Sequence, residues 1–333
     1  MKAFIVDRYR KNAPLRCGDV PEPIPGQDDV LVDVHAAGLN PLDAKIRDGA
    51  FKAVIPYRPP FILGHDVAGI VIGIGSNVRR FKLGDEVYAR PRDGRIGTFA
   101  ERIAIDQADV ALKPETIGMA EAASIPLVGL TAWQALVEQA GLEKGQKVLI
   151  HAGTGGVGTF AIQLAKHLGA TVATTTSTAN VDLVKRLGAD IVIDYRKQEF
   201  DKLLSGYDVV LNSLDGATLR KSLDVLKPGG KLISISGPPD PDFARAQGMN
   251  WLLRQVMRLL SLGIRRRAAA RDIDYSFLFM RANGSQLGQI TALVDKGIIR
   301  PVVDRIFPFD GTNEALAFVE TGRVKGKVVV KLR

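Results

Sequence analysis

The glycine run at residues 152–158 constrains the fold of this 333-residue chain more than any other segment. It follows a short apolar stretch at residues 147–151 and opens a helical pattern that continues to residue 168. The spacing G-x-G-x-x-G begins at Gly153, and between a strand and a helix this spacing is typical of a dinucleotide-binding turn. Free N–H groups at the start of such a helix bind phosphate. The alternative is a structural turn that binds nothing.

Strand-like and helix-like segments alternate after this turn, and the alternation continues to about residue 235. Within it, a helix is expected over residues 219–226, a break at 228–230 and a strand at 231–235. Such alternation predicts a parallel sheet with helices on both faces. The sequence therefore predicts an α/β chain with a doubly wound domain at residues 124–297.

The two ends of the chain have a different pattern. Short runs rich in β-branched residues, separated by proline and glycine, fill the first 105 or so residues and return at 300–307 and 327–331. A chain of this length exceeds what a single core usually supports, so two domains are expected. We predict that residues 1–123 and 298–333 form one β-rich domain, into which the doubly wound domain is inserted.

Composition narrows the class of protein and its partners. Cys17 is the only cysteine, which excludes a disulfide framework and a thiolate metal site. The formal net charge of +9 favours anionic partners, a phosphorylated cofactor among them, but no nucleic-acid-binding motif is present and no nucleic-acid partner is expected. The N-terminal apolar stretch is too short for a signal peptide or a membrane span. We therefore expect a soluble cytoplasmic protein.

The segment after the second strand of the doubly wound domain bears on which dinucleotide is bound. NAD sites usually carry a carboxylate about 20 residues beyond the glycine turn, where it binds the ribose 2′-hydroxyl. Residues 174–180 read Thr-Thr-Thr-Ser-Thr-Ala-Asn, and no carboxylate precedes Asp182. A carboxylate would repel a 2′-phosphate, whereas hydroxyls can donate hydrogen bonds to it, so the sequence favours NADPH. A site with little preference is the alternative.

Several segments occur together in a characteristic order: residues 36–45, 64–69, 78–87, 130–133, 187–190, 193–195 and 326–330. With the glycine turn they resemble the medium-chain dehydrogenase/reductase superfamily, and within it the zinc-independent quinone oxidoreductase and alkenal (enone) reductase branch. The resemblance covers nearly the whole chain. It implies a Rossmann domain inserted into a GroES-like catalytic domain, and a homodimer.

The resemblance also implies which residues contact the cofactor. Ser177 and Tyr195 would flank the 2′-phosphate and adenosine ribose, while Asn180 stands where relatives often have a lysine, so one cationic contact is missing. The full set implied for NADPH binding is Thr131, Thr154, Gly155, Gly156, Val157, Ser177, Asn180, Tyr195, Leu214, Ser236, Phe279, Arg323 and Lys325.

Asn40, Asp43 and Tyr57 are the candidate catalytic residues. The resemblance implies that Asn40 and Asp43 lie on the substrate side of the site, where Asp43 orients its neighbours. A turn-capping pair is the alternative for these two residues. Relatives often place a tyrosine near Phe51, which leaves Tyr57 as the nearby candidate proton donor.

No metal is expected. The zinc-dependent branch of the superfamily would need a cysteine where Asn40 stands and a further thiolate ligand, and catalytic zinc normally takes three protein ligands. His65 matches one ligand position, but we expect it to be packed or hydrogen-bonded instead.

Without zinc the chemistry is expected to act on substrates that are already electrophilic. The sequence therefore predicts an NADPH-dependent reductase of a quinone or an α,β-unsaturated carbonyl. Alternatives are a reductase of acyl intermediates, a non-catalytic NADPH-binding protein with a nucleic-acid or regulatory role, and a zinc-dependent alcohol dehydrogenase, which is disfavoured.

The segment 251–271 combines apolar residues at helical spacing with six arginines. We interpret it as a surface helix or a lid beside the substrate. A membrane-surface helix is a second interpretation, and a nucleic-acid contact is a third.

Overall fold

The computed structural model describes residues 1–52 and 54–333, which divide into two compact units. The β-rich unit comprises residues 1–130 and 281–333, and the nucleotide unit comprises residues 131–280. Both ends of the chain thus belong to one unit, and the other unit is inserted between them in the sequence, as the predicted fold class requires. Residues 124–130 and 281–297, which the sequence assigned to the inserted domain, lie in the β-rich unit.

The β-rich unit contains a three-stranded sheet in the order β2-β1-β4 and a seven-stranded sheet in the order β15-β16-β3-β5-β6-β8, with β7 paired to β3. Its strands are β1 (Lys2–Val6), β2 (Arg16–Asp19), β3 (Asp29–Leu39), β4 (Phe61–Ile62), β5 (Asp66–Ile74), β6 (Glu86–Ala89), β7 (Arg102–Asp106), β8 (Val110–Leu112), β15 (Val303–Pro308) and β16 (Lys327–Lys331). Its helices are α1 (Pro41–Arg47), α2 (Met119–Ala123), α10 (Gly284–Asp295) and α11 (Thr312–Glu320).

Strand β3 is central to this unit because it pairs with β5, β7 and β16. Val30, Val32 and Val34 alternate along it and are fully buried, as a strand with one covered face requires. The pairing of β3 with β16 joins residues near the start of the chain to residues near its end, since Leu39 lies opposite Val328. This pairing places Asn40 and Lys327 in the same neighbourhood.

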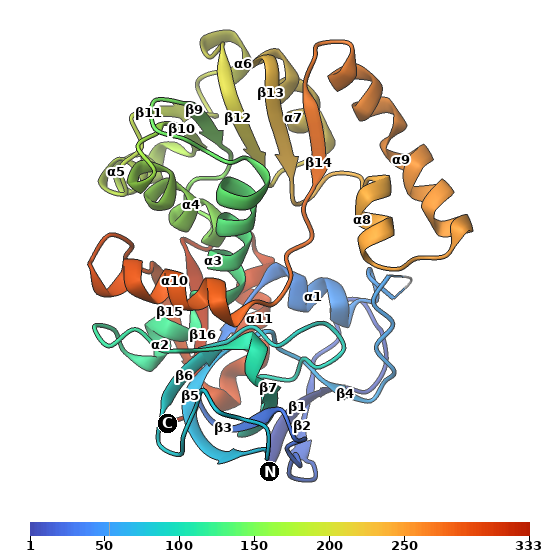
Figure 1. The fold of residues 1–333 in the computed structure, drawn as a ribbon, viewed down its shortest axis with the longest axis vertical. Coiled ribbons are helices and arrows are strands. Elements are labelled where there is room, and N and C mark those ends of the chain that lie inside the picture. The colour runs from blue at the N-terminus through green and yellow to red at the C-terminus, as the bar shows by residue number, and fades with distance from the viewer. Residues whose placement is uncertain (53) are drawn as a thin grey trace. The chain divides into compact units, whose positions relative to one another are not determined.

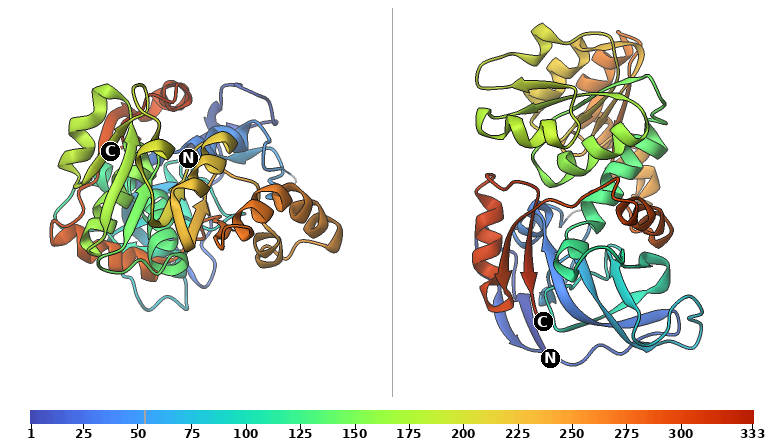
Figure 2. Two further views of the ribbon diagram at one scale, coloured as in Figure 1. Left: turned by 90° about the horizontal axis from the view of Figure 1, so that it is seen from above. Right: turned by 90° about the vertical axis from the view of Figure 1, so that its left-hand side faces the viewer.

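The nucleotide unit is built on a six-stranded parallel sheet in the order β11-β10-β9-β12-β13-β14, which is the Rossmann order 3-2-1-4-5-6. Helices cover the sheet (Figures 1 and 2). The strands are β9 (Lys147–Ile150), β10 (Thr171–Thr176), β11 (Ile191–Asp194), β12 (Tyr207–Asn212), β13 (Leu226–Ser234) and β14 (Asp274–Phe277). The helices are α4 (Gly156–His167), α5 (Val181–Arg186), α6 (Phe200–Leu203), α7 (Gly216–Lys221), α8 (Pro241–Ala246) and α9 (Trp251–Ala269).

The order of the strands reverses between β9 and β12, which are neighbours in the sheet although the strands β10 and β11 lie between them in the sequence. In doubly wound sheets, ligands bind outside the carboxyl ends of the strands at this reversal. The glycine run follows β9 directly, and Asn212 ends β12. The topology therefore places the glycine turn at the ligand-binding position of the sheet.

Two local features differ from the sequence expectations. Helix α7 ends at Lys221 and a 3₁₀ turn, Ser222–Asp224, follows it, so the expected helix over 219–226 is wrong in position. Strand β13 begins at Leu226 and runs through 228–230, which the sequence took for a break. The register with β12 shifts there, and such an irregularity accommodates a proline within a sheet. Helix α3 (Pro126–Trp133) continues into a π-helical segment, Gln134–Gln139.

Across residues 1–52 and 54–333, no helix has both the length and the apolar character needed to cross a bilayer.

Candidate functional site

The glycine turn has the geometry of a phosphate cradle. A Cβ on Gly153 would collide with the side chain of Thr174, and one on Gly158 would collide with the Ala152 carbonyl oxygen. A Cβ on Gly155 would instead meet only that carbonyl oxygen, at 3.3 Å. Packing within the protein therefore explains the first and third glycines. The second leaves space above the backbone at the start of α4, where a pyrophosphate would approach.

Strand β10 holds the turn from one side. The Ala152 N–H donates to Thr175 Oγ1 at 3.1 Å, and the Gly153 N–H donates to the Thr175 carbonyl at 3.0 Å. Ala152 has a φ of +52°, in the left-handed region that non-glycine residues rarely occupy. Surrounding structure must hold such a conformation in place, and strain of this kind is concentrated at functional sites. The two bonds from Thr175 supply this restraint.

His151 lies beneath the turn and extends the same network inward. Its Nδ1 is 3.2 Å from Thr175 Oγ1, and its Nε2 is 3.0 Å from Ser222 Oγ. The Ser222 hydroxyl donates to the Thr218 carbonyl at 2.8 Å, so Nε2 must carry the imidazole proton. Burial lowers the pKa of His151 to about 4, which keeps the ring neutral at physiological pH. The sequence analysis did not assign His151 any role.

The end of β10 carries the residues implied for the adenosine side. The Tyr195 N–H donates to the Thr176 carbonyl at 3.1 Å, and Asn180 Nδ2 donates to Ser177 Oγ at 3.2 Å. The tyrosine side chain is 60% exposed, so its ring is available to a ligand. The structure thus brings Ser177, Asn180 and Tyr195 together at the carboxyl ends of β10 and β11.

A carboxylate also lies at this edge of the sheet. The sequence analysis did not identify it, because it searched only about 20 residues beyond the glycine turn. Asp194 ends β11, and its Oδ2 accepts a 2.6 Å hydrogen bond from the Thr178 hydroxyl. Its Oδ1 accepts a hydrogen bond from the Arg196 N–H, and its Oδ2 lies 3.9 Å from Lys197 Nζ. The Thr178 hydrogen bond, the Arg196 N–H and the nearby cations lower the pKa of Asp194. The carboxylate is therefore ionised, with its oxygens engaged by the protein.

The residues implied for the nicotinamide side lie partly together. Ser236 Oγ donates to the Leu214 carbonyl at 2.5 Å, which joins the segments after β12 and β13. Phe279 packs against Phe243 with ring centroids 5.6 Å apart. Thr131 is buried near the end of α3. Val157 and Thr154 belong to the glycine turn, where the Thr154 hydroxyl is 3.4 Å from that of Thr176.

Arg323 and Lys325 belong to the β-rich unit, in the turn between α11 and β16. Both side chains are exposed. The Lys325 N–H donates to Asp304, which fixes the backbone of the turn and leaves the ammonium outside that contact.

Asn40 and Asp43 are part of a buried polar cluster in the β-rich unit. Asn40 is the N-cap of α1, and its N–H donates to Asp43 Oδ2 at 2.7 Å, so the two residues do form a capping pair. Asp43 Oδ1 lies 2.6 Å from His65 Nδ1. Asp43 and His65 are fully buried and Asn40 is 2% exposed.

Lys327 and Asp66 complete this cluster, and the sequence analysis did not assign either of them a role. Lys327 Nζ donates to Asp66 Oδ2 at 2.8 Å and to Asn40 Oδ1 at 2.5 Å. Asn40 Nδ2 donates to the same Asp66 oxygen, whose partner oxygen accepts from the Leu127 N–H. Both side-chain groups of Asn40 are thus engaged within the protein. A buried ammonium paired with a buried carboxylate makes this cluster a structural centre of the unit.

Tyr57 lies outside that cluster. Its hydroxyl accepts a 3.3 Å hydrogen bond from the Gly94 N–H, and its ring stacks on Phe61. Burial raises the pKa of Tyr57 to about 12, against the opposing effect of the Gly94 bond. The phenol therefore stays protonated at neutral pH, and its proton is not committed to Gly94.

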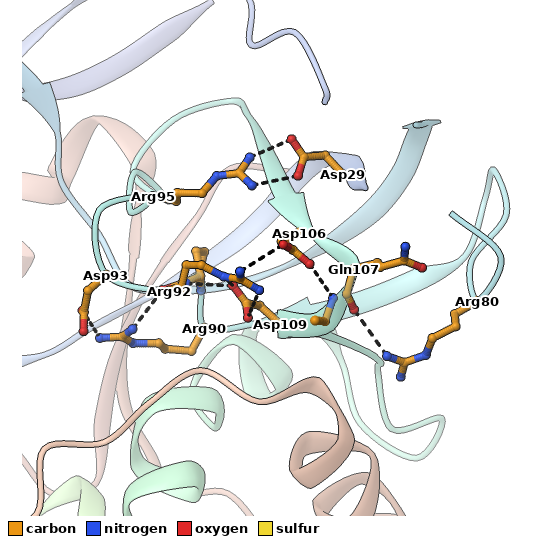
Figure 3. A network of polar contacts seen from close by, with 11 residues as sticks. Asp29, Arg80, Arg90, Arg92, Asp93, Arg95, Asp106, Gln107 and Asp109 are labelled. Carbon is orange, nitrogen blue, oxygen red and sulfur yellow. Dashed lines mark hydrogen bonds and ion pairs between the residues drawn. The ribbon is translucent and has the colours of Figure 1, made fainter. Parts of the chain in front are cut away.

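A network of arginines and aspartates fixes the loop that carries Gly94 (Figure 3). Arg95 makes two hydrogen bonds to Asp29, at 2.8 and 2.7 Å, and Arg92 makes two to Asp109. Bidentate pairs of this kind hold both orientation and distance. The network thereby positions the backbone donor to Tyr57.

Among the described residues, no group of three or more His, Cys, Asp or Glu side chains is placed to hold a metal ion. His65 is hydrogen-bonded through Nδ1, and its buried Nε2 has no partner in the described part of the chain. Zinc independence stays a prediction.

Comparison with known proteins gives the family. Residues 26–115 match the alcohol dehydrogenase GroES-like domain, and residues 187–330 match the family described as zinc-binding dehydrogenase. The chain is 36% identical to the mitochondrial NAD(P)H oxidoreductase RTN4IP1 of Danio rerio over 355 residues, covering 100% of this chain and 91% of that protein. The chain belongs to the medium-chain dehydrogenase/reductase superfamily.

Two further members of the superfamily place the chain in the quinone and alkenal oxidoreductase branch. The chloroplastic NADPH-dependent alkenal/one oxidoreductase of Arabidopsis thaliana is 36% identical, covering 99% of this chain and 79% of its own length. The structure of the quinone oxidoreductase from Coxiella burnetii matches with a TM-score of 0.87 and 32% identity, covering 100% of this chain and 99% of that one. This member of the superfamily is an NAD(P)H-dependent oxidoreductase.

Proposed function

We propose that this protein is an NADPH-dependent reductase that transfers hydride to a quinone or an α,β-unsaturated carbonyl compound, without zinc. The observation that carries the proposal is the glycine turn at the Rossmann reversal, where a Cβ on Gly155 would meet only the Ala152 carbonyl oxygen and a pyrophosphate has room to approach. The substrate class is supported by two relatives, an alkenal/one oxidoreductase of Arabidopsis thaliana and a quinone oxidoreductase of Coxiella burnetii.

The end of β10 supports NADPH over NADH. Ser177 supplies a hydroxyl and Tyr195 an exposed ring where an NAD site would place a carboxylate. Asp194 is close to this edge, but its oxygens accept from Thr178 and Arg196. Arg196 and Lys197 add positive charge beside it. The preference is therefore expected to be real but moderate, since Asn180 provides no cation.

The chemistry divides between cofactor and protein. A bound nicotinamide supplies the hydride, which adds to the β-carbon of the enone or to the quinone ring. Negative charge then develops on the substrate oxygen, and hydrogen-bond donors stabilise it. Tyr57 offers a protonated phenol for this role, whereas the buried Asn40 and Asp43 act by positioning α1. A proton from Tyr57 or water completes the two-electron reduction.

The experiment is a titration of the purified chain with NADPH and with NADH, followed by turnover of 1,4-naphthoquinone and of a short-chain enone. We expect NADPH to bind more tightly and both electrophiles to be reduced with stoichiometric NADPH oxidation. Absence of NADPH binding would overturn the proposal. Binding with no turnover of either electrophile would point instead to a non-catalytic NADPH-binding protein.

The zinc-free assignment has its own test. Activity measured before and after exhaustive chelation with EDTA or 1,10-phenanthroline should be unchanged, and metal analysis should find less than stoichiometric zinc. Complete loss of activity that added zinc restores would contradict it.

We also propose a homodimer formed by strand pairing at β14, which is one of the two edge strands of the nucleotide sheet. Edge strands present unpaired backbone groups that a second copy can bind. Sedimentation equilibrium would detect the dimer, and a monomer in that measurement would contradict this proposal. A cytoplasmic location stays a prediction, tested by fractionation.

A further inference from the structure

Helix α9 has one apolar face that packs into the nucleotide unit. Met257, Ser261, Ile264 and Ala268 recur at the spacing of one helical face, and all four are buried. Ile264 and Ala268 belong to the same core cluster as Tyr275 of β14. The helix is therefore fixed to the edge of the sheet and needs no further partner to hold it in place.

The same helix has a second apolar face, which is exposed. Leu252, Val256, Leu259 and Leu260 follow the spacing i, i+4, i+7, i+8, and Leu252 and Leu259 are 62% and 69% exposed. Trp251, the first residue of the helix, is 72% exposed. In Figure 1, α9 is the long helix beside β14. An exposed apolar row on a helix that is already packed on its other side indicates an interaction surface.

Positive charge accompanies this exposed row. Residues 251–271 contain six arginines and no aspartate or glutamate. Arg271 pairs with Asp224 at 2.9 Å, and the Arg254 guanidinium donates to the Met249 carbonyl. The other four arginines are Arg258, Arg265, Arg266 and Arg267. None of these four has an ion-pair partner in the described part of the chain.

We propose that α9 binds the surface of an anionic phospholipid bilayer and lies parallel to it. Leucine and valine side chains would enter the boundary between headgroups and acyl chains, and Trp251 would sit at headgroup depth. The arginines would contact lipid phosphates. The contact is peripheral, because no helix among the described residues can cross a membrane.

Charge decides between this occupant and a second copy of the chain. In a symmetric dimer built on α9 the same patch would face itself, and the arginines of both copies would repel one another. A nucleic acid would satisfy the arginines but leave the exposed leucines in water. An anionic bilayer is complementary to both parts of the surface. The inference stands apart from the proposed function, although a lipophilic quinone would be met at such a surface.

The test is flotation of the full-length protein with vesicles of phosphatidylcholine alone and of phosphatidylcholine with 30% phosphatidylglycerol. We expect binding to the anionic vesicles, at least tenfold weaker binding to the neutral ones, and a fall in binding between 0.1 and 0.5 M NaCl. Tryptophan emission should shift to shorter wavelength on binding, and Trp251→Phe should remove the shift. Equal binding to both kinds of vesicle, or binding to neither, would overturn the proposal.

Matched variants separate the two parts of the surface. Leu252→Asp with Leu259→Asp should reduce vesicle binding at least tenfold, whereas Leu83→Asp, at a leucine that is 63% exposed in the other unit, should not. Arg266→Gln with Arg267→Gln, which follow Leu259 and Leu260 by seven residues on the same side of the helix, should abolish the preference for anionic lipid, whereas Arg8→Gln with Arg10→Gln should keep it. NADPH binding should survive in all four, which distinguishes failure here from failure of the proposed function. Loss of a dimer in the leucine variant, without a change in vesicle binding, would assign the face to a second copy instead.

Discussion

The glycine turn of the nucleotide unit and the polar cluster of the β-rich unit use their polar groups in opposite ways. In the cluster, the side chains of Asn40, Asp66 and Lys327 satisfy one another out of contact with water. At the turn, a backbone held from beneath by Thr175 leaves space beside Gly155 for a ligand. The sequence marks both places with short motifs. Only the turn has the open geometry that binding requires.

This comparison predicts which measurement each substitution affects. A change in the cluster should appear in the free energy of unfolding, because it leaves a buried charge without its partner. A change at the turn should appear in cofactor affinity. The predictions below test that division.

The largest effect is expected from Lys327→Met. It removes the ammonium between Asp66 and Asn40 and leaves the Asp66 carboxylate buried without a cation at 2.8 Å. Breaking a buried pair in this way costs about 3–5 kcal/mol. Urea unfolding of the β-rich unit would measure it, and Lys331→Met, at the exposed end of the same strand, should leave that free energy nearly unchanged. A loss no larger in Lys327→Met than in the control would break the comparison.

His151 links the glycine turn to the interior. Its low pKa makes the free energy of unfolding of the protein depend on pH. Its pKa is about 4 in the folded chain and 6.5 for the ordinary group, so the unfolded chain binds the proton more readily. Stability is therefore full above pH 6.5 and falls as the pH decreases towards 4. The contribution is about 3 kcal/mol. It should be absent from His151→Gln, so the unfolding free energies of the two proteins should converge as the pH falls through this window. Parallel pH profiles would show that His151 does not titrate as the structure indicates.

Two glycines of the turn should respond differently to the same substitution. In Gly153→Ala the new methyl group meets Thr174, and overpacking of this kind costs about 1–3 kcal/mol of stability. In Gly155→Ala the methyl group meets only the Ala152 carbonyl oxygen, at 3.3 Å, so a small backbone shift admits it, and it occupies the approach of the pyrophosphate. We expect NADPH affinity to fall about tenfold, or about 1.4 kcal/mol, with little change in unfolding. Gly288→Ala, with nothing near its Cβ, is the control, and equal affinities in it and in Gly155→Ala would contradict the cradle.

The smallest effect is expected from Asn180→Lys, which adds a cation beside Ser177. An exposed charge pair contributes at most about 1 kcal/mol, so the preference for NADPH over NADH should rise up to about fivefold. The ratio of the two dissociation constants measures it at low and high salt. Gln247→Lys, at an exposed position in the segment after α8, should leave the ratio unchanged. If NADH affinity rose as much as NADPH affinity, the added lysine would not be acting on the 2′-phosphate, which only NADPH carries, and the assigned position of that phosphate would be wrong.

The resemblance and the local patterns together anticipated the fold class and the glycine turn. Turn chemistry and the alternation of strand and helix depend on residues close in the chain, which explains why β9, α4 and β10 agree with expectation. Strand β13 did not agree, because its pairing with β12 starts at Leu226 and resumes at Lys231, and the register shift between them accommodates Pro228 and Gly229. The candidate contacts at Ser177, Asn180 and Tyr195 were implied by resemblance, and their roles stay proposals.

What the sequence by itself determined is therefore the glycine turn and the class of sheet that carries it, since both follow from backbone conformation and local periodicity. The tertiary structure decided the partners of Asn40. Its contact with Lys327 joins residues 287 positions apart, through the pairing of β3 with β16. The tertiary structure also decided which face of α9 is buried. This helix has apolar residues on two sides, so its own sequence does not determine which side packs against the sheet. Pairing between distant strands and burial against the sheet supply that choice.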